Sequence, residues 1–198
     1  MFLLHSRMRL LMANRKSVQP KSLLLATALG ILIAAAAAAQ QPDIPRPLPQ
    51  QVLSKAPGLH PLGRGRHTVW GVRVYDATLW IVGPQWSADR PQALDIEPGR
   101  AVPAETLVKN AIAEMHDLRI GDDSKIRLWQ AEMRKIMPSV KEGDQVVIFC
   151  APSSRTLLYF NNSTAGEVDD PSFCPAVMSV WLHPETKHQA MRKSLLRQ

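Results

Sequence analysis

The stretch Gly65-Arg66-His67-Thr68-Val69-Trp70-Gly71-Val72-Arg73-Val74-Tyr75-Asp76-Ala77-Thr78-Leu79-Trp80-Ile81-Val82 is rich in β-branched and aromatic residues. Glycine begins it, and Gly83-Pro84 follows it. This composition indicates strand rather than helix. Gly71 lies near the middle, where a bulge or a tight reversal would divide the stretch into two strands.

Alternation along residues 71–82 distributes the side chains over two faces. If these residues form one strand, the first face carries Arg73, Tyr75, Ala77, Leu79 and Ile81. Both faces are largely apolar, so we expect this strand to be central in its sheet and covered on both sides. An arginine and a tyrosine on one such face are candidates for the mouth of a ligand cleft. The alternative is a surface arginine beside a core tyrosine.

Residues 1–39 differ in composition from the rest of the chain. They hold five basic residues and no acidic ones, followed by an apolar run from Ser22 to Ile33 and by the alanines 34–39. This pattern predicts a secretory signal peptide that is cleaved after Ala39, with Met8 or Met12 as alternative starts. The competing interpretation is an uncleaved membrane anchor of about 18 residues.

The basic balance of the chain comes mostly from this leader. The whole chain has 24 Lys and Arg against 17 Asp and Glu. Without the five basic residues of positions 1–39, 19 basic and 17 acidic residues remain, a net charge of about +2. Nucleic-acid binding therefore loses its main support. No stable membrane span is expected after cleavage.

Cys150 and Cys174 are the only cysteines. In an oxidising compartment they form either one disulfide or two buried thiols, and two cysteines carry no spacing signature that decides between these states. The six histidines are scattered singly without metal-ligand spacing, so the sequence predicts no metal site.

The remaining chain divides into a linker and one domain. Closely spaced prolines indicate a Pro/Gln-rich extended linker over residues 40–61, with the globular domain over 62–198. Residues 93–97 alternate apolar and acidic, as in a short strand exposed on one side. Helices are predicted after Pro103 and from Asp122 to Pro138. Trp129, Met133 and neighbouring apolar residues form a stripe that is typical of core, or of a ligand groove.

The C-terminal third predicts a meander followed by helices. Two strands, residues 145–150 and 155–160, are separated by a loop of hairpin length, and residues 165–168 return as a short third strand. A helix follows Pro171, and residues 184–196 form a last helix with basic residues toward its end. Together these elements predict an α+β domain.

The order of these motifs resembles the chalcone isomerase-like family, and specifically its exported bacterial branch. The resemblance runs from about Leu62 to Leu196. It is carried by Val74-Tyr75-Asp76-Ala77-Thr78-Leu79-Trp80, Ala93-Leu94-Asp95-Ile96, Glu105-x-Leu107, Trp129 with Ile136-Met137-Pro138, Lys141-x-Gly143-Asp144, Tyr159-Phe160-Asn161, Gly166-Glu167, Asp170-Pro171-x-Phe173 and Trp181-Leu182.

This resemblance implies an open-faced β-sandwich in which an antiparallel sheet packs against a layer of helices, with a cleft between them. Plant enzymes of the family close a flavanone ring in that cleft without a cofactor. Related members without this activity resemble fatty-acid binders in which arginine and tyrosine hold a carboxylate. No cofactor is therefore expected.

Residue by residue, the family's arginine falls on Arg66, or on Arg64 if the register slips. Its small hydroxyl residue falls on Tyr75, a departure that weakens the case for ring closure. Arg73 is a further candidate because it is expected to share a face with Tyr75. These residues suggest a periplasmic, non-catalytic protein that binds a small amphipathic carboxylate such as a fatty acid.

Two other functions remain open. One is a cofactor-independent isomerase, an intramolecular lyase of the chalcone isomerase type, acting on an unidentified substrate. It would need a proton donor or base besides Arg66 and Tyr75, and none of His67, Lys109 and His116 is placed for that role, so the sequence predicts no catalytic residue. The other is an envelope protein that engages a partner, not identified by the sequence, through its proline-rich segment or a sheet edge.

Overall fold

The computed structural model describes residues 44–151 and 155–198. The predicted signal peptide, residues 1–39, lies outside the described residues. Within them, residues 45–198 form one compact unit.

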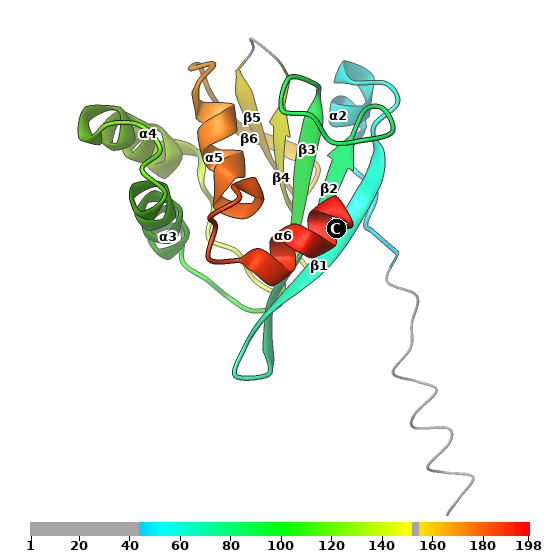
Figure 1. The fold of residues 1–198 in the computed structure, drawn as a ribbon, viewed down its shortest axis with the longest axis horizontal. Coiled ribbons are helices and arrows are strands. Elements are labelled where there is room, and N and C mark those ends of the chain that lie inside the picture. The colour runs from blue at the N-terminus through cyan, green and yellow to red at the C-terminus, as the bar shows by residue number, and fades with distance from the viewer. Residues whose placement is uncertain (1–43, 152–154) are drawn as a thin grey trace, which may run out of the picture. The chain divides into compact units, whose positions relative to one another are not determined.

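Six antiparallel strands form one sheet in which sequence order and spatial order agree (Figure 1). The strands are β1 (His60–Val69), β2 (Val72–Ile81), β3 (Gln92–Pro98), β4 (Val146–Cys150), β5 (Thr156–Phe160) and β6 (Ser163–Val168). Each strand pairs with the next one, as in a meander. Sequence patterns predicted all six, including the division of the opening stretch at Gly71.

Four helices pack on one face of this sheet (Figure 1). They are α3 (Ala104–Asp117), α4 (Asp123–Ile136), α5 (Phe173–Leu182) and α6 (Gln189–Leu196). The helix α4 begins as predicted, because Asp122 caps it by accepting a hydrogen bond of 2.8 Å from the backbone N–H of Lys125. Apolar residues of the helices and of one sheet face form the main core. The predicted α+β class, an antiparallel sheet against a helical layer, is confirmed.

The opposite face of the sheet is covered by the segment before β1. The short helix α2 (Gln50–Lys55) and its flanks bury Leu48, Val52, Ala56 and Leu59. These side chains form a second core with alternate residues of the strands, among them Ala93, Val147 and Tyr159. The expectation of an extended linker up to residue 61 is therefore wrong for this segment, because its apolar residues between the prolines recur at helical spacing and are buried.

The hairpin between β1 and β2 has a two-residue turn and an irregular register. Trp70 and Gly71 form the turn with φ of 53° and 76°. His67 pairs with Tyr75 and Thr68 pairs with Arg73, so Val74 is an extra residue on β2. Such a bulge reverses the alternation of side chains beyond it. Arg73 is consequently directed to the face opposite Tyr75.

Glycines on β1 allow α6 to pack directly on the strand. Gly63 and Gly65 face α6, and a Cβ atom on Gly63 would collide with the backbone carbonyl groups of Ser194 and Leu195. A Cβ on Gly65 would lie 2.5 Å from the Sδ of Met191. The last helix therefore approaches β1 more closely than any side chain would permit.

Strand β3 differs from the expectation of one exposed side. Its residue Asp95 has no exposed surface, and its neighbours Ala93 and Leu94 are equally buried. The apolar and acidic residues alternate as predicted, but α2 and its flanks cover the part of the sheet that the pattern suggested was exposed.

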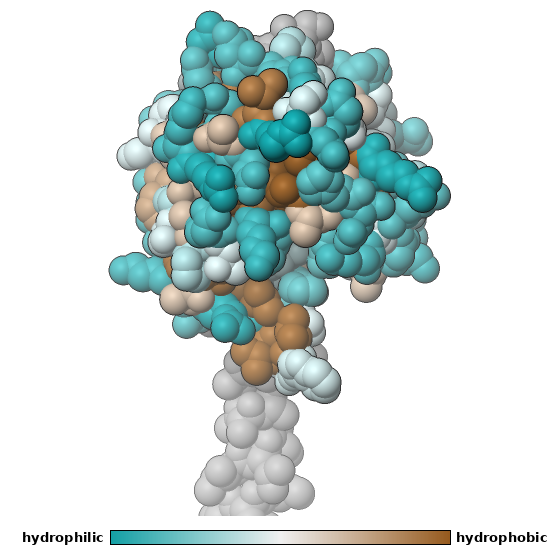
Figure 2. Space-filling view, turned by 90° about the vertical axis from the view of Figure 1, so that its left-hand side faces the viewer, coloured by the Kyte–Doolittle hydropathy of each residue, from teal (hydrophilic) through white to brown (hydrophobic). Residues whose placement is uncertain are grey.

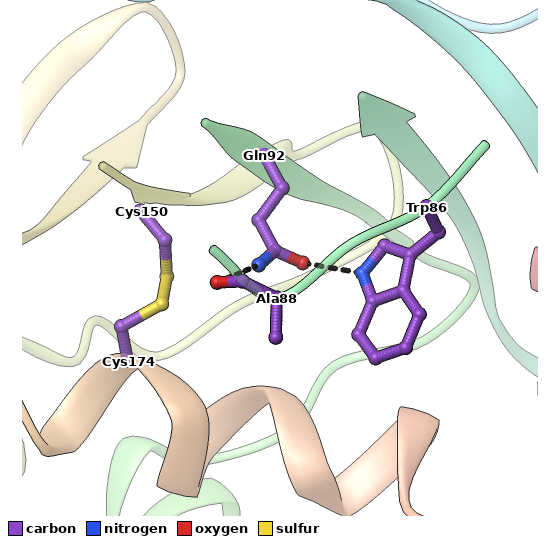
Figure 3. The surroundings of a disulfide bond; sticks show 5 residues. All are labelled: Trp86, Ala88, Gln92, Cys150 and Cys174. Atoms are coloured by element: carbon purple, nitrogen blue, oxygen red, sulfur yellow. Dashed lines mark hydrogen bonds between the residues drawn. A yellow bond between two sulfur atoms is a disulfide. The ribbon is translucent and has the colours of Figure 1, made fainter. Parts of the chain in front are cut away.

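A disulfide joins β4 to α5 through Cys150 and Cys174, with Cα atoms 5.8 Å apart (Figure 3). Beside it, the buried side chain of Gln92 on β3 is hydrogen-bonded to the loop that precedes this strand. Its Oε1 accepts a 2.8 Å hydrogen bond from Trp86, and its Nε2 donates to the carbonyl of Ala88 at 3.5 Å. The structure thus favours the disulfide among the two states that the sequence left open.

No helix among the described residues is long and apolar enough to cross a membrane.

We expect Gly63→Ala to destabilise the domain by about 1–3 kcal/mol, because the new methyl group forces α6 away from β1. Gly63 has no positive φ, so the effect is steric rather than a backbone preference. Urea unfolding measures it, with the exposed Thr68→Ala on the same strand as control. Equal stability of the two variants would contradict the close approach of α6.

Replacing both Cys150 and Cys174 by alanine should lower the free energy of unfolding by about 3.5 kcal/mol, the chain-entropy value for a loop of this length. The two residues are separated by 24 positions. Thermal unfolding with and without a reducing agent checks the assignment. The reductant should lower the melting temperature of the wild type and leave that of the double variant unchanged.

Candidate functional site

The structure separates the residues that the sequence grouped as a ligand site. Tyr75 lies on the helix-covered face, where its hydroxyl accepts a 3.0 Å hydrogen bond from Nε1 of Trp181 on α5. Arg66 and Arg73 both reach the carboxylate of Asp76 on the opposite face. The prediction that Arg73 and Tyr75 share a face is wrong, because the bulge at Val74 lies between them.

On that opposite face, three arginines converge on one buried carboxylate. We call this group the arginine cluster: Arg64, Arg66, Arg73, Asp76 and Glu97. Arg66 grips Asp76 with both ends of its guanidinium, Nε to Oδ1 at 2.7 Å and Nη2 to Oδ2 at 3.1 Å. Arg64 and Arg73 reach Oδ2 at 3.3 and 3.1 Å. Arg64 also binds Glu97 at 2.6 Å.

The arginines keep Asp76 ionised although its side chain is only 3% exposed. Burial alone would raise the pKa of this carboxyl. The hydrogen bonds from Arg66 and the charges of Arg73, Arg66 and Arg64 outweigh burial and hold the pKa below its usual value. Asp76 thus occupies the bidentate position on Arg66 that a ligand carboxylate would use.

A second buried carboxyl lies beside the cluster without a comparable partner. Asp95 is opposite Thr78 on β2, and no hydrogen-bond partner for its carboxyl oxygens lies among the described residues. Burial raises its pKa to about 7, partly opposed by the neighbouring Gln145 side chain, while the charge of Glu97 adds to the increase. Asp95 therefore takes up a proton near neutral pH.

On the helix-covered face, Tyr75 belongs to a group of polar side chains that we call the tyrosine site: His67, Tyr75, Glu114, Trp181 and His188. The His67 ring lies 5.1 Å from the Tyr75 ring and 5.2 Å from the His188 ring, measured between centroids. No acceptor for the Tyr75 hydroxyl proton is found among the described residues. Tyr75, His67, Trp181 and His188 are all partly exposed.

Glu114 anchors this site from α3. It is 4% exposed, and its Oε1 lies 3.3 Å from Nε2 of His188. Lys187 forms an ion pair with the same oxygen. The strand, α3 and the segment entering α6 thus contribute one connected series of titratable groups, from Glu114 through His188 and His67 to Tyr75.

Burial shifts the acidity of two members of the tyrosine site. It raises the pKa of Tyr75, an effect that the hydrogen bond from Trp181 opposes and the charge of Glu114 reinforces. Burial and the neighbouring His188 lower the pKa of His67. Both groups are therefore neutral at pH 7. Each is able to donate a hydrogen bond, depending on the imidazole tautomer.

A small apolar pocket lies deeper in the helical layer. It is lined by Met133, Ile136, Met137, Ile148, Thr156, Leu158, Phe173 and Val177. The helix α5 extends from this pocket, at Phe173 and Val177, to the tyrosine site at Trp181. Trp181 follows Phe173 by eight positions, which corresponds to about 12 Å along the helix axis. The methionines of the predicted stripe are therefore both core and pocket lining.

Sequence analysis did not find Glu114, Trp181 or His188 as site residues. Trp181 lies 106 positions from Tyr75, and no spacing rule connects residues so far apart. His67 was visible in the opening stretch but lacked a partner there. The sequence signals were the Trp181-Leu182 motif of the family resemblance and several titratable residues on elements predicted to pack together.

Among residues 44–151 and 155–198, no group of three or more His, Cys, Asp or Glu side chains is arranged to hold a metal ion.

The family model "Chalcone isomerase-like" matches residues 47–197. The chain belongs to the chalcone isomerase-like family. The match begins ahead of α2, which agrees with the packing of that segment as part of the domain. No curated protein matches the chain in sequence.

Among solved structures, the chain is similar to a fatty-acid binding protein of Arabidopsis thaliana. The two superpose with a TM-score of 0.55 at 10% sequence identity, over 71% of this chain and 88% of the plant chain. At this identity the likeness shows a shared fold. It confirms the chalcone isomerase-like, open-faced arrangement of sheet and helices.

Asp95→Asn should remove a pH dependence of stability. The folded-state pKa of about 7 exceeds the unfolded value of 3.8. Stability is therefore complete below about pH 4 and falls as the pH rises through 7, by about 4 kcal/mol in total. Urea unfolding between about pH 4 and pH 8 should show this decrease in the wild type only, with the variant more stable at alkaline pH. If the free energy of unfolding depended on pH equally in the wild type and in the variant, this would contradict a proton on Asp95.

Proposed function

We propose that this family member binds a small amphipathic carboxylate, such as a fatty acid, between the sheet and the helical layer. The observation that carries the proposal is the Tyr75 hydroxyl. It accepts a hydrogen bond from Trp181, lies against His67 and has no acceptor for its own proton among the described residues. A partly exposed donor of this kind, beside a second donor, suits a carboxylate oxygen.

Protonation of His67 would strengthen such binding. Its pKa is lowered because burial and the neighbouring His188 disfavour the charged ring. A ligand carboxylate beside the ring would favour the imidazolium form and raise the pKa of His67. Affinity should therefore increase as the pH falls below neutrality. Lys187 compensates the charge of Glu114, which would otherwise repel the ligand.

The ligand's tail would follow α5 toward the apolar pocket. Each buried methylene contributes about 0.8 kcal/mol, so even a medium-length chain gains substantial affinity. The pocket is small, and a tail must displace side chains to enter it. Met133 and Met137 line it, and methionine adapts easily because its side chain is unbranched and flexible. The fatty-acid binding named for the structurally similar plant protein supports this choice of ligand.

Arg66 and Arg73 remain the alternative position for the carboxylate. A ligand there would compete with Asp76 for the fork of Arg66, which already makes two hydrogen bonds. Release of Asp76 would leave a buried charge with fewer partners, at a cost of several kcal/mol. The tyrosine site needs no such exchange, and for this reason we favour it.

We further propose export to the periplasm. The leader pattern of residues 1–39 supports it. So does the Cys150–Cys174 disulfide, since disulfides persist in oxidising compartments.

A cofactor-independent isomerase is the second candidate, favoured by the series Glu114, His188, His67 and Tyr75. A carboxylate that orients one histidine beside a second histidine and a phenol is an arrangement suited to general acid–base chemistry. Such an enzyme would move a proton between two positions of one substrate. Turnover of flavonoid-like substrates that is lost in His67→Ala and retained in Arg66→Ala would favour this candidate.

Removal of the Tyr75 hydroxyl tests the proposed binding site. We expect Tyr75→Phe to weaken fatty-acid binding about tenfold or more, the value of a hydrogen bond to a charged group. Native mass spectrometry and titration with fatty acids of different length would measure it. Tyr159→Phe is the matched control, because the chain's other tyrosine is buried in the second core on the opposite face.

Arg66→Ala, measured in parallel, locates the carboxylate. Binding that survives this variant but not Tyr75→Phe supports the tyrosine site. Binding that survives Tyr75→Phe but is lost in Arg66→Ala would place the ligand's carboxylate at the arginine cluster. A wild-type protein that contains no acyl ligand and ignores added fatty acids would refute the function itself.

A further inference from the structure

The tip of the β1–β2 hairpin carries a concentration of exposed apolar residues. Trp70 is 98% exposed, and its neighbours Val72 and Val69 are 57% and 42% exposed. The hairpin projects beyond the helices in Figure 1. Figure 2 shows apolar residues gathered at the lower end of the described part, where the hairpin lies. We call these residues, Val69 to Val72, the hairpin tip.

Folding alone does not explain tryptophan at this position. Trp70 has a φ of 53°, in the left-handed region that bulky side chains avoid. Asparagine or glycine would suit such a turn better. The side chain is almost fully exposed, so its burial contributes almost nothing to the fold. The Trp70 side chain is therefore the largest apolar group of the tip, its backbone conformation is unfavourable, and no packing of the side chain compensates for this.

The surroundings of the tip are rich in exposed basic side chains. Arg66 on β1 is 55% exposed. Arg100 is exposed and follows Gly99, whose N–H binds the carbonyl of Val74 on β2. Lys141 is exposed and precedes Glu142, an exposed acid whose Oε1 lies 3.6 Å from Nη1 of Arg73. An apolar tip with basic side chains behind it is complementary to an anionic lipid surface.

A lipid surface fits the tip better than a protein partner. A stable protein interface buries about 800 Å² on each side, more than a two-residue turn with two valines offers. Insertion into a bilayer interface needs only a few apolar side chains, and tryptophan is the residue most suited to the headgroup level. We propose that the hairpin tip inserts into the interfacial region of a bilayer that contains anionic lipids.

This attachment would place the tyrosine site near the membrane. Tyr75 is three residues beyond Val72 on β2, about 10 Å along the strand. A fatty acid leaving the bilayer would then have a short path to the Tyr75 hydroxyl. This step rests on the proposed function, whereas attachment of the tip does not.

Trp70→Asn is the decisive variant, because asparagine tolerates the left-handed turn and removes the apolar ring. Co-sedimentation with vesicles of phosphatidylcholine and phosphatidylglycerol should show binding of the wild type that is about tenfold weaker in the variant. Both proteins carry the same N-terminal residues, so the difference isolates the hairpin. Val72→Thr, which keeps the strand propensity, should weaken binding by a smaller factor.

Two further measurements define the lipid contact. Brominated lipids should quench tryptophan fluorescence in the wild type more than in Trp70→Asn, and added salt should reduce binding to the anionic vesicles. Circular dichroism and fatty-acid titration without vesicles should be equal in both proteins. If those titrations show no ligand binding while vesicles still bind, the proposed function fails and the membrane contact stands.

Equal vesicle binding by the wild type and Trp70→Asn would overturn the proposal. So would an absence of quenching by brominated lipids. Self-association of the wild type that disappears in Trp70→Asn, without vesicle binding, would also overturn it and identify the tip as a contact between copies of the chain.

Discussion

The buried carboxylate of Asp76 is the charge around which β1 and β2 are arranged. An ionised group that is 3% exposed needs strong partners, and three arginines from the two strands supply them. Arg73 becomes one of these partners because the bulge at Val74 directs it to the same face. A regular strand would have placed Arg73 beside Tyr75 and would have left Asp76 with fewer donors. The bulge thus separates the arginines from the tyrosine.

This separation gives the sheet two polar sites of different character. The arginine cluster is internally paired, with Asp76 and Glu97 occupying its guanidinium groups. The tyrosine site has neutral donors that are partly exposed and adjoin the helical layer. On the face of the arginine cluster, the charged groups stabilise the fold by pairing with one another. On the helix-covered face, the donors of the tyrosine site are suited to bind a ligand. The chalcone isomerase-like fold supplies the helical layer against which an apolar tail is expected to lie.

The close approach of α6 connects the strand chemistry to the tyrosine site. Gly63 and Gly65 let the helix lie on the backbone of β1, and the residue just before α6 is His188. Its ring therefore meets His67 on the same strand and Glu114 on α3. In the sequence Gly63-Arg64-Gly65-Arg66-His67, glycines on one side accommodate the helix while arginines on the other side hold Asp76. One alternating segment thus serves both faces.

Much of the fold followed from local patterns. The strand composition around Gly71, the cap at Asp122 and the meander after Gly143 each predicted an element that the structure contains, because strand propensity, capping and turn chemistry act over a few residues. The α2 segment was missed because proline density suggested an extended chain, whereas burial of Val52 and its neighbours decides its conformation. Asp95 looked exposed for a related reason, since the covering segment is distant in sequence.

The sequence by itself determined the class of the fold and identified Tyr75 and the arginines as the chemically distinctive residues of the β1–β2 hairpin at the edge of the sheet. Only the tertiary structure decided which of them meet. A one-residue bulge reverses the side-chain alternation of a strand, and no local signal announced it. The hydrogen-bond partner of Tyr75, Trp181, comes from a helix that lies 106 positions away in the sequence. Contacts at that separation depend on how the helical layer packs against the sheet, which is a property of the whole domain.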